Sequence, residues 1–169
     1  MAQHTRLTGA AGLTAAGLLA VTLLFNLEGI RLYVYRDVVG VHTYCVGETK
    51  DAEKKLGQRF TREQCRSILI ERLIGDYEKG MRRCLTFPDI LPEKTYVAFL
   101  SFTYNVGIGG FCRSSVRRHA NAGDLKGACN ALMLWVKPKV LYGRRNKEKK
   151  LCLQGVAEGL PVTIVPAPN

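Results

Sequence analysis

The feature that most constrains this chain is a stretch near its N-terminus without any charged residue. Residues 7–27 are uncharged, a run of 21 positions, which is the length that an α-helix needs to cross the core of a bilayer. Arg6 and the amino terminus precede the run, so the N-terminus is expected on the cytoplasmic side and the remainder outside. The chain has 169 residues, which leaves room for one further domain.

The same stretch is a weak membrane anchor because small residues dilute its leucines. Small side chains bury little apolar surface, so insertion is expected to be marginal and reversible. The run ends at Leu27 without the small residues of a signal-peptidase site, which favours retention over cleavage. A cut after Ala20 and an ordinary permanent anchor remain alternatives. The diluting residues are Gly9, Gly12, Gly17, Ala10, Ala11, Ala15, Ala16, Ala20, Thr8, Thr14 and Thr22.

One face of the predicted helix leads directly to an acidic side chain. Three apolar residues share a helix face with Glu28, and Gly29 after it is a typical helix stop. In a bilayer this face would lie in lipid, whereas in a folded domain it would pack on protein. We therefore expect release from the membrane to let residues 20–27 refold as the helix that positions Glu28. The three apolar residues are Val21, Leu24 and Phe25.

The rest of the chain has one β region followed by helices. Residues 32–47 are rich in Tyr, Val and Thr and predict short strands joined by turns. Thr61 and Gln64 form a capping box that starts a long helix ending near residue 79. A buried helix is expected over residues 94–106, before a group of glycines. Shorter helices are predicted over residues 114–122, 124–135 and 144–153. The fold class is therefore α+β, mainly α: a small β-hairpin lobe, a long linking helix and a helical C-terminal lobe.

Six cysteines suggest an oxidising compartment. An even number in a small domain is typical of exported proteins, which agrees with the orientation of the N-terminal run. No CxxC or HxxxH spacing occurs, so no metal site is expected. The sequence alone leaves fifteen disulfide connectivities open. The cysteines are Cys45, Cys65, Cys84, Cys112, Cys129 and Cys152.

Positive charge is concentrated in the C-terminal half. The net charge is +11, and residues 113–150 contain eleven Lys or Arg against two acids, Asp124 and Glu148. This segment is either a solvated basic face or a surface that meets a polyanion. Zinc-finger spacing and the aromatic-basic motifs of RNA-binding domains are absent, so no nucleic-acid partner is expected.

Two carboxyls and a hydroxyl have a spacing that suits glycosidic bond cleavage. That reaction needs a protonated carboxyl and a second carboxylate that attacks or activates water. Apolar neighbours would raise the pKa of Glu28 and keep it protonated, whereas exposure in a hairpin would keep Asp37 ionised. Thr43 is able to hold a water through its hydroxyl. Taken singly, the three are equally typical of a helix end, a turn and a strand.

Residues 28–43 resemble the active-site stretch of the phage-type lysozymes, glycoside hydrolase family 24. The family pattern E-G-x-R-x-x-x-Y-x-D-x-x-G-x-x-T is met at every fixed position, from Glu28 to Thr43. Residues 102–107 resemble the buried helix of the family's second lobe, and residues 144–152 resemble its last helix. The resemblance covers roughly residues 28–155 and implies a lysozyme-like two-lobed fold.

The resemblance also implies a reaction and a role for each residue. The family hydrolyses the β-1,4 bond between N-acetylmuramic acid and N-acetylglucosamine with inversion, without a metal or other cofactor. Glu28 would be the general acid, Asp37 would position or activate the attacking water, and Thr43 would hold that water. Either Arg144 or Arg145 would support Glu28. The residues expected to bind the sugar are Tyr35, Asn105 and Trp135.

A departure from the family pattern points to a subset of the family. Where the family often has glycine after the threonine, this chain has Cys45, and Glu48 precedes Thr49. The cysteine version resembles the signal-anchor-release endolysins, which are tethered to the inner membrane of a Gram-negative host and then become soluble in the periplasm. By the same resemblance, the expected disulfides are Cys45–Cys65, Cys84–Cys112 and Cys129–Cys152.

These expectations divide the chain into three parts and give it two partners. Residues 1–27 are the signal-anchor-release or transmembrane segment, residues 28–155 the catalytic domain, and residues 156–169 a flexible tail with prolines. The partners are peptidoglycan and the inner membrane through residues 7–27, and the chain is expected to be a monomer. The alternatives are an inactive lysozyme-like wall-binding or morphogenetic membrane protein, a cationic membrane permeabiliser and a transglycosylase.

Overall fold

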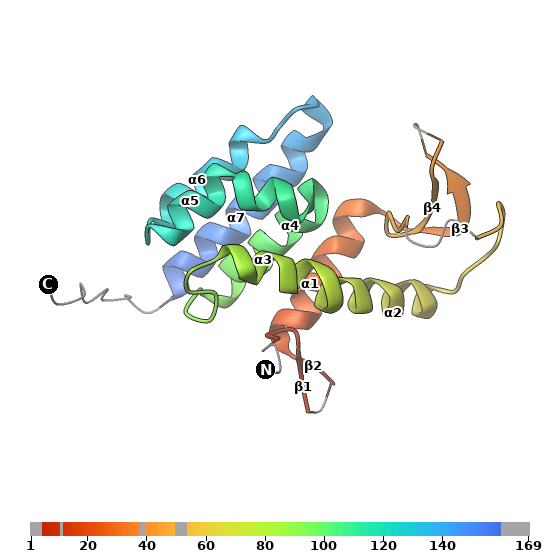
Figure 1. The fold of residues 1–169 in the computed structure, drawn as a ribbon, viewed down its shortest axis with the longest axis horizontal. Helices are drawn as coiled ribbons and strands as arrows, with labels where there is room; N and C mark the ends of the chain where they lie inside the picture. The colour runs from red at the N-terminus through yellow and green to blue at the C-terminus, as the bar shows by residue number, and fades with distance from the viewer. Residues whose placement is uncertain (1–4, 11, 38–39, 50–53, 160–169) are drawn as a thin grey trace, which may run out of the picture.

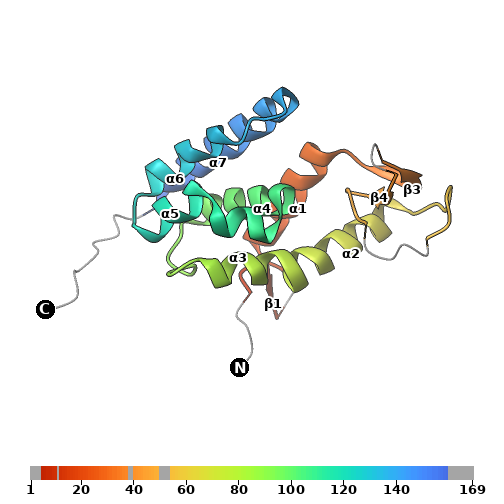
Figure 2. The same cartoon turned by 45° about the horizontal axis from the view of Figure 1, so that its top comes forward.

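The computed structural model describes residues 5–10, 12–37, 40–49 and 54–159. Two lobes are visible in Figure 1: a β-hairpin lobe, and a helical lobe that runs from α4 (Glu93–Arg113) to α7 (Tyr142–Glu158). A helical run extends along both lobes, and α1 (Ala15–Glu28) crosses between them, as the turned view in Figure 2 also shows. The run consists of α2 (Arg62–Arg72), η1 (Leu73–Glu78) and α3 (Lys79–Cys84). The mainly helical, two-lobed fold that the sequence predicts is confirmed.

The N-terminal segment is not one helix but a small hairpin followed by a helix. Strands β1 (Thr8–Gly9) and β2 (Gly12–Leu13) pair antiparallel, and α1 follows (Ala15–Glu28). Thr14 caps α1, since its hydroxyl accepts the amide hydrogen of Gly17 at 3.2 Å. Among the described residues, no helix combines the length and the apolar character needed to span a bilayer.

Helix α1 buries the face that the sequence predicts. Val21 and Leu24 are 5% and 0% exposed, and Phe25 packs against the same core. The helix contacts α4 of the helical lobe and ends at Gly29, whose φ of 70° is a conformation that favours glycine. The prediction that a helix places Glu28 at its C-terminal end is therefore confirmed.

The hairpin lobe consists of β3 (Arg31–Arg36) and β4 (His42–Cys45), which pair antiparallel with an irregular register. Residue Arg59 bridges to the outer side of β3 and extends this small sheet. Cys45 has a φ of 54°, in the left-handed region that few side chains adopt. Glycine adopts this conformation more readily than other residues, and a disulfide from Cys45 to Cys65 holds the cysteine in place.

The linking helix begins as predicted and ends later than predicted. Thr61 and Gln64 form both hydrogen bonds of the capping box, but the helical run continues past residue 79 to Cys84. It contains a π-helical turn that the sequence does not signal. The run continues because Gly80 and Met81 are buried against the rest of the molecule. Its parts are α2 (Arg62–Arg72), η1 (Leu73–Glu78) and α3 (Lys79–Cys84).

The helical lobe forms around α4 (Glu93–Arg113), which is buried from Thr95 to Thr103 and breaks at Gly107. Gly107 has φ 78° and ψ 159°, so the predicted helix end is confirmed there, although helix resumes through Gly109 and Gly110. Disulfides join Cys84 to Cys112 and Cys129 to Cys152, the pairs that the resemblance implies. The other helices are α5 (Ser115–Asn121), α6 (Leu125–Ala131), η2 (Leu132–Leu134), η3 (Lys139–Leu141) and α7 (Tyr142–Glu158).

Helix α7 is longer at its C-terminal end than predicted. Its last turns belong to the lobe because Gly155 lies directly on Thr95, where a Cβ would approach the Thr95 nitrogen to 2.5 Å, and Val156 packs against the core. Placing the start of the flexible tail at residue 156 is therefore wrong, since the helix continues to Glu158. The rest of the predicted tail, residues 160–169, lies outside the described residues.

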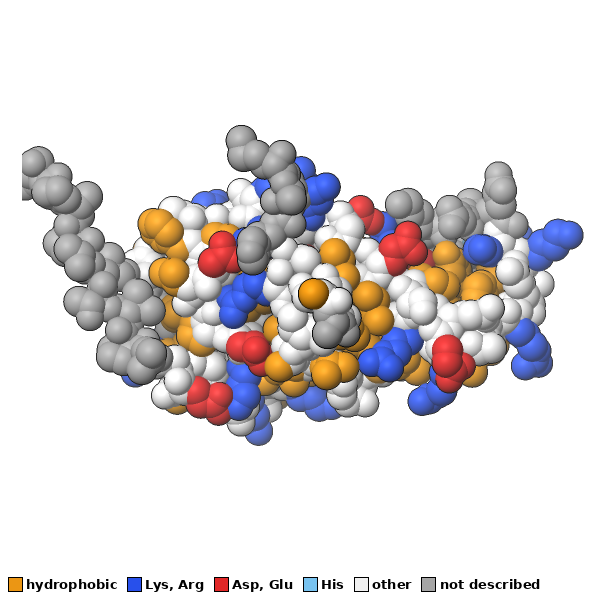
Figure 3. Space-filling view, turned by 90° about the horizontal axis from the view of Figure 1, so that it is seen from below, with side chains coloured by type: hydrophobic (Ala, Val, Ile, Leu, Met, Phe, Trp, Pro, Cys, Tyr) orange, Lys and Arg blue, Asp and Glu red, His pale blue; other side chains and the backbone are white. Residues whose placement is uncertain are grey.

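Basic side chains are distributed over the surface rather than gathered at one place in the view from below. Figure 3 shows Lys and Arg side chains across the whole of that face, with Asp and Glu side chains between them. Such an arrangement is typical of a surface that attracts polyanions in general and keeps the protein soluble. Among the described residues, it does not form a single anion-binding patch on this face.

Candidate active site

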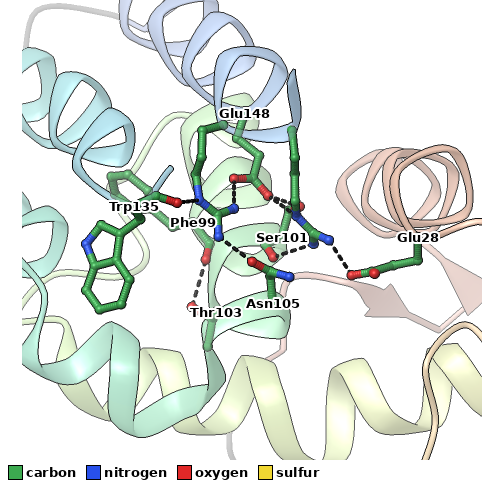
Figure 4. Close-up of polar contacts among 9 residues, drawn as sticks. Glu28, Phe99, Ser101, Thr103, Asn105, Trp135 and Glu148 are labelled. Atoms are coloured by element: carbon green, nitrogen blue, oxygen red, sulfur yellow. Dashed lines mark hydrogen bonds and ion pairs between the residues drawn. The ribbon is translucent and has the colours of Figure 1, made fainter. Parts of the chain in front are cut away.

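Glu28 lies at the junction of the two lobes, at the last position of α1. Its side chain is 21% exposed, and its Oε1 accepts a hydrogen bond at 2.5 Å from Nη1 of Arg144 in α7. Figure 4 shows Glu28 extending from the end of α1 towards this guanidinium. Of the two arginines that the resemblance proposes as support for Glu28, the contact is made by Arg144.

Arg145 makes its hydrogen bonds inside the helical lobe, to Trp135, Asn105 and Glu148. Its Nε donates to the carbonyl oxygen of Trp135 at 3.1 Å, and its Nη2 donates to Oδ1 of Asn105. The guanidinium lies 4.8 Å above the ring of Phe102. Burial lowers the pKa of Arg145, and the nearby Glu148 carboxylate opposes that shift.

Glu148 joins the two arginines. It is completely buried, and its Oε1 accepts from Nε of Arg144 at 2.9 Å while its Oε2 accepts from Nη1 of Arg145 at 2.5 Å. Ser101 of α4 donates its hydroxyl to the same Oε1 at 2.7 Å. Neither Glu148 nor Ser101 was predicted as a site residue. The spacing of Glu148 four and three residues after two arginines on one helix was the available signal, and Ser101 carries none.

The hairpin lobe carries Asp37 just after β3 and Thr43 within β4. Asp37 follows β3 and closes the turn: its amide donates to the Val41 carbonyl at 2.9 Å, and its Oδ1 accepts from the Val41 amide at 2.9 Å. Thr43 pairs with Tyr35 across the sheet. It is 4% exposed and donates its hydroxyl to the Val41 carbonyl at 3.2 Å. Both side chains therefore contact the same backbone unit of the turn.

The three predicted sugar-binding residues are not gathered around Glu28. Tyr35 is half-buried in the hairpin lobe, with the guanidinium of Arg31 4.2 Å from its ring centre. Asn105 accepts from Arg145 and lies near Glu28 in Figure 4, whereas Trp135 lies on the opposite side of the arginines. The Trp135 ring meets Phe102 edge to face at 5.4 Å, so the tryptophan packs on the core of the helical lobe.

Tyr104 ties the two lobes together beside Glu28. Its hydroxyl donates at 2.6 Å to the carbonyl oxygen of Val46, just after β4, and its ring packs on Tyr77 with centres 4.7 Å apart. Burial raises the pKa of Tyr104, and the negative charge of Glu28 adds to that effect. The lobes are therefore joined by a direct polar contact near the acidic side chain.

The hollows found along the linking helix do not include Glu28. One, of about 460 Å³, is lined by Glu78, Arg82 and Pro88 among others. The other, of about 530 Å³, lies between η1 and the break in α4 at Gly107. Within the described ranges, no three His, Cys, Asp or Glu side chains are grouped so as to hold a metal ion.

A carboxyl at the junction of two lobes, with a second carboxyl on the facing hairpin, suits acid-catalysed cleavage of a sugar chain. Fold and site together define a glycosidase of the lysozyme type. The family model described as phage lysozyme matches residues 26–150, and the chain belongs to the phage lysozyme family.

Several proteins similar to this chain come from phages. A SAR-endolysin of Bacteriophage PS119 is 40% identical over 142 residues, which cover 77% of this chain and 78% of the relative. A SAR-endolysin of Pseudomonas phage phiKMV is 36% identical over 145 residues, covering 80% and 86%. The crystal structure of a P22 lysozyme mutant has a TM-score of 0.72 at 31% identity, covering 80% of this chain and 95% of that one. The endolysin of Escherichia coli O157:H7 phage FAHEc1 has a TM-score of 0.70 at 27% identity, covering 86% and 96%.

Proposed function

We propose that this muramidase hydrolyses the bond between N-acetylmuramic acid and N-acetylglucosamine in peptidoglycan, with Glu28 as the general acid. The observation that carries the proposal is the position of Glu28: at the end of a helix with one buried face, between the lobes, and held by the Arg144 guanidinium at 2.5 Å. Asp37 is the base that activates water, and Thr43 holds that water. The protein acts as a monomer.

The reaction assigns one task to each lobe. The proton of Glu28 moves to the glycosidic oxygen as the bond to the sugar carbon breaks. Water attacks that carbon from the opposite face and gives its proton to Asp37, so the configuration at the carbon inverts. Inversion requires the two carboxyls to be about 6.5–9.5 Å apart, with room for the water between them.

A matched set of single substitutions tests these roles. Glu28→Gln and Asp37→Asn each keep the shape of the side chain and remove its acid–base chemistry, so clearing of chloroform-treated Gram-negative cells should fall at least about 100-fold. Glu63→Gln is the control, since Glu63 is an exposed residue of α2, and it should clear cells at the rate of the unchanged protein. If Glu28→Gln clears cells at that rate too, Glu28 is not the acid.

The digestion products separate hydrolysis from its alternatives. Mass spectrometry of the released muropeptides should show reducing ends, and NMR of fresh product should show the inverted anomer. Anhydro ends would instead identify a transglycosylase. If the unchanged protein binds the wall and releases no fragments, it is an inactive lysozyme-like wall-binding module. If cells lyse without fragments, the protein is a permeabiliser.

We propose further that residues 1–27 first tether the protein to the inner membrane and that residues 28–155 then act in the periplasm. The uncharged run and the SAR-endolysin relatives support this two-state model. Val21 and Leu24 are buried in the folded protein, so the same face is not available to lipid at the same time. Fractionation of expressing cells should find the protein first in the membrane pellet and later in the soluble periplasmic fraction, without shortening.

A further inference from the structure

We propose that Glu148 is a positioning residue of the active site: it fixes the Arg144 guanidinium against Glu28 and offsets the positive charge of the arginine pair. The inference rests on the proposed role of Glu28 as the acid. It concerns a side chain that does not touch Glu28 and acts through Arg144.

Arg144 has three anchors, and only one of them is Glu28. Its Nε donates to Glu148 at 2.9 Å and its Nη2 to the carbonyl oxygen of Ser101 at 3.1 Å. With these two nitrogens held from behind, the remaining Nη1 faces Glu28 at 2.5 Å. A planar guanidinium held at two corners has a single orientation for the third, so the direction of the contact with Glu28 is set by groups behind it.

Glu148 itself has no freedom to move. It is fully buried, and its two oxygens accept from Ser101, Arg144 and Arg145. All three partners come from α4 or α7, the two helices of the lobe that pack together most extensively. Figure 4 shows Glu148 above the two guanidinium groups, with Glu28 on the far side of one of them. The carboxylate therefore joins the packing of the lobe to the geometry of the acid.

The second part of the inference concerns charge. Among the described residues, the charged and titratable groups of this region include Arg144, Arg145 and Glu148 of α7 and Tyr104 of α4, with Tyr77, Glu48 and Arg72 acting on Tyr104. Two cations next to a general acid would favour its ionised form, which has no proton to donate. The buried carboxylate of Glu148 reduces the net charge of the α7 group to that of one cation.

Glu148→Gln is the test, because it keeps the size of the side chain and removes its charge. We expect kcat to fall roughly tenfold to a hundredfold, with KM changed less than about twofold because Glu148 does not reach the surface. The alkaline limb of the pH–activity profile should move down by about one to two pH units. The ¹³C carboxyl resonance of Glu28, identified by its absence in Glu28→Gln, should show the same downward shift of its titration midpoint without any substrate.

Two further variants keep the test decisive. Glu158→Gln, on the same helix in an exposed pair with Lys94, should keep the unchanged profile and resonance. The double variant Arg145→Gln with Glu148→Gln restores the net charge of the α7 group to that of one cation, but Arg144 still lacks its contact with Glu148. The pH profile should therefore return towards that of the unchanged protein, while kcat stays low. The double variant also leaves no unpaired Arg145 in the interior, so it remains informative if Glu148→Gln alone folds poorly.

The outcomes distinguish this inference from the proposed function. If Glu148→Gln lowers only the thermal midpoint, and its pH profile and the Glu28 resonance match those of the unchanged protein, Glu148 is merely structural and the inference fails. If the unchanged protein has no muramidase activity, the proposed function fails, while the resonance still reports whether Glu148 acts on Glu28.

Discussion

Glu78 is a charged side chain with 1% of its surface exposed, and the N-terminal segment donates hydrogen bonds to it. Its Oε1 accepts from the amide of Arg6 at 2.8 Å and from the Tyr96 hydroxyl at 2.6 Å, and its Oε2 accepts from the hydroxyl of Thr5. A buried carboxylate is tolerated only when it is well paired. The segment around Thr5 and Arg6 is thus attached to the middle of the linking helix.

Glu78→Gln should weaken that attachment. The glutamine side chain keeps one oxygen as an acceptor but carries no charge, and its NH₂ group faces a donor that the second carboxylate oxygen had accepted from. The free energy of unfolding should therefore fall by about 2 kcal/mol. Urea denaturation measures the change, and limited proteolysis should cut the N-terminal segment sooner. Glu71→Gln, an exposed residue of the same helical run, is the control; equal stability of the two variants would contradict the role of Glu78.

At the residue scale, the sequence predicted which side chains carry charge near the site but not how they pair. Position 28 at a helix end followed from spacing and from Gly29. The choice between Arg144 and Arg145 depends on which side of α7 faces α1, and adjacent residues on a helix differ by about 100°. Ser101 gave no signal, because a single serine within an apolar helix face has no predictable role until its partner on α7, Glu148, is known.

Helix α1 shows that a glycine has a second use besides weakening a membrane anchor. A Cβ on Gly17 would lie 2.1 Å from the carbonyl oxygen of Leu7 and 2.9 Å from Leu13, so the β1–β2 hairpin folds back onto α1 only if position 17 is glycine. At Gly9, by contrast, the nearest atom to a Cβ would be 3.9 Å away, on Thr14. The folded state therefore requires glycine at position 17, whereas it has room for a side chain at position 9.

Two leucine substitutions should separate the membrane role from the folding role. Gly9→Leu strengthens the apolar run without a clash, so it should prolong membrane retention while the detergent-purified protein keeps its full activity. Gly17→Leu should do both: prolong retention and reduce the stability of the released protein by several kcal/mol, because backbone atoms must move. Cell fractionation and thermal unfolding measure the two effects, and equal thermal midpoints for the two variants would refute the assignment.

At the scale of elements, prediction succeeded where one pattern dominated. The capping box gave the correct start of α2, Gly29 gave the correct end of α1, and the Tyr/Val-rich stretch gave the hairpin of the β-lobe. The β1–β2 hairpin of the folded state was not predicted, because an uncharged run is typical of a membrane helix, whereas the neighbouring Arg6 is held by tertiary hydrogen bonds to Glu78 and Leu91. The π turn η1 was also missed, since an inserted turn leaves the helical pattern of the sequence nearly unchanged.

Three disulfides connect the parts of the whole molecule. Cys45–Cys65 joins the β-lobe to α2, Cys84–Cys112 joins α3 to α4, and Cys129–Cys152 joins α6 to α7. The pairs are separated by 20, 28 and 23 residues in the sequence. Each link therefore restricts the unfolded chain by a loop of similar size.

Reduction should lower stability by a large and similar amount for each bond. Loops of these lengths correspond to about 3 kcal/mol apiece in the chain-entropy account. Guanidinium unfolding of the oxidised and reduced protein measures the sum, and paired Cys→Ala variants measure each bond. An unfolding midpoint that does not move on reduction would show that packing alone sets the stability of the molecule.

At the scale of the molecule, the two-lobed architecture followed from the order of elements and from the family resemblance. The sequence predicted that residues 20–27 join the folded unit after release, but not that residues 5–10 and 12–19 are part of it too. Apolar residues of the N-terminal segment are suited both to a bilayer and to a protein core, so composition alone does not distinguish a membrane helix from a helix packed on protein.

The attachment at Glu78 has a consequence for how activation proceeds. In the tethered state that we propose, Thr5 and Arg6 lie on the cytoplasmic side, and they are the last part of the segment to leave the lipid. The folded state needs Arg6 at the carbonyl oxygens of Pro88 and Leu91, so its charged side chain must first be carried through the bilayer, at a cost of a few kcal/mol. We therefore expect the contacts of Thr5 and Arg6 with the linking helix to form last, after residues 20–27 have left the lipid and packed on the protein.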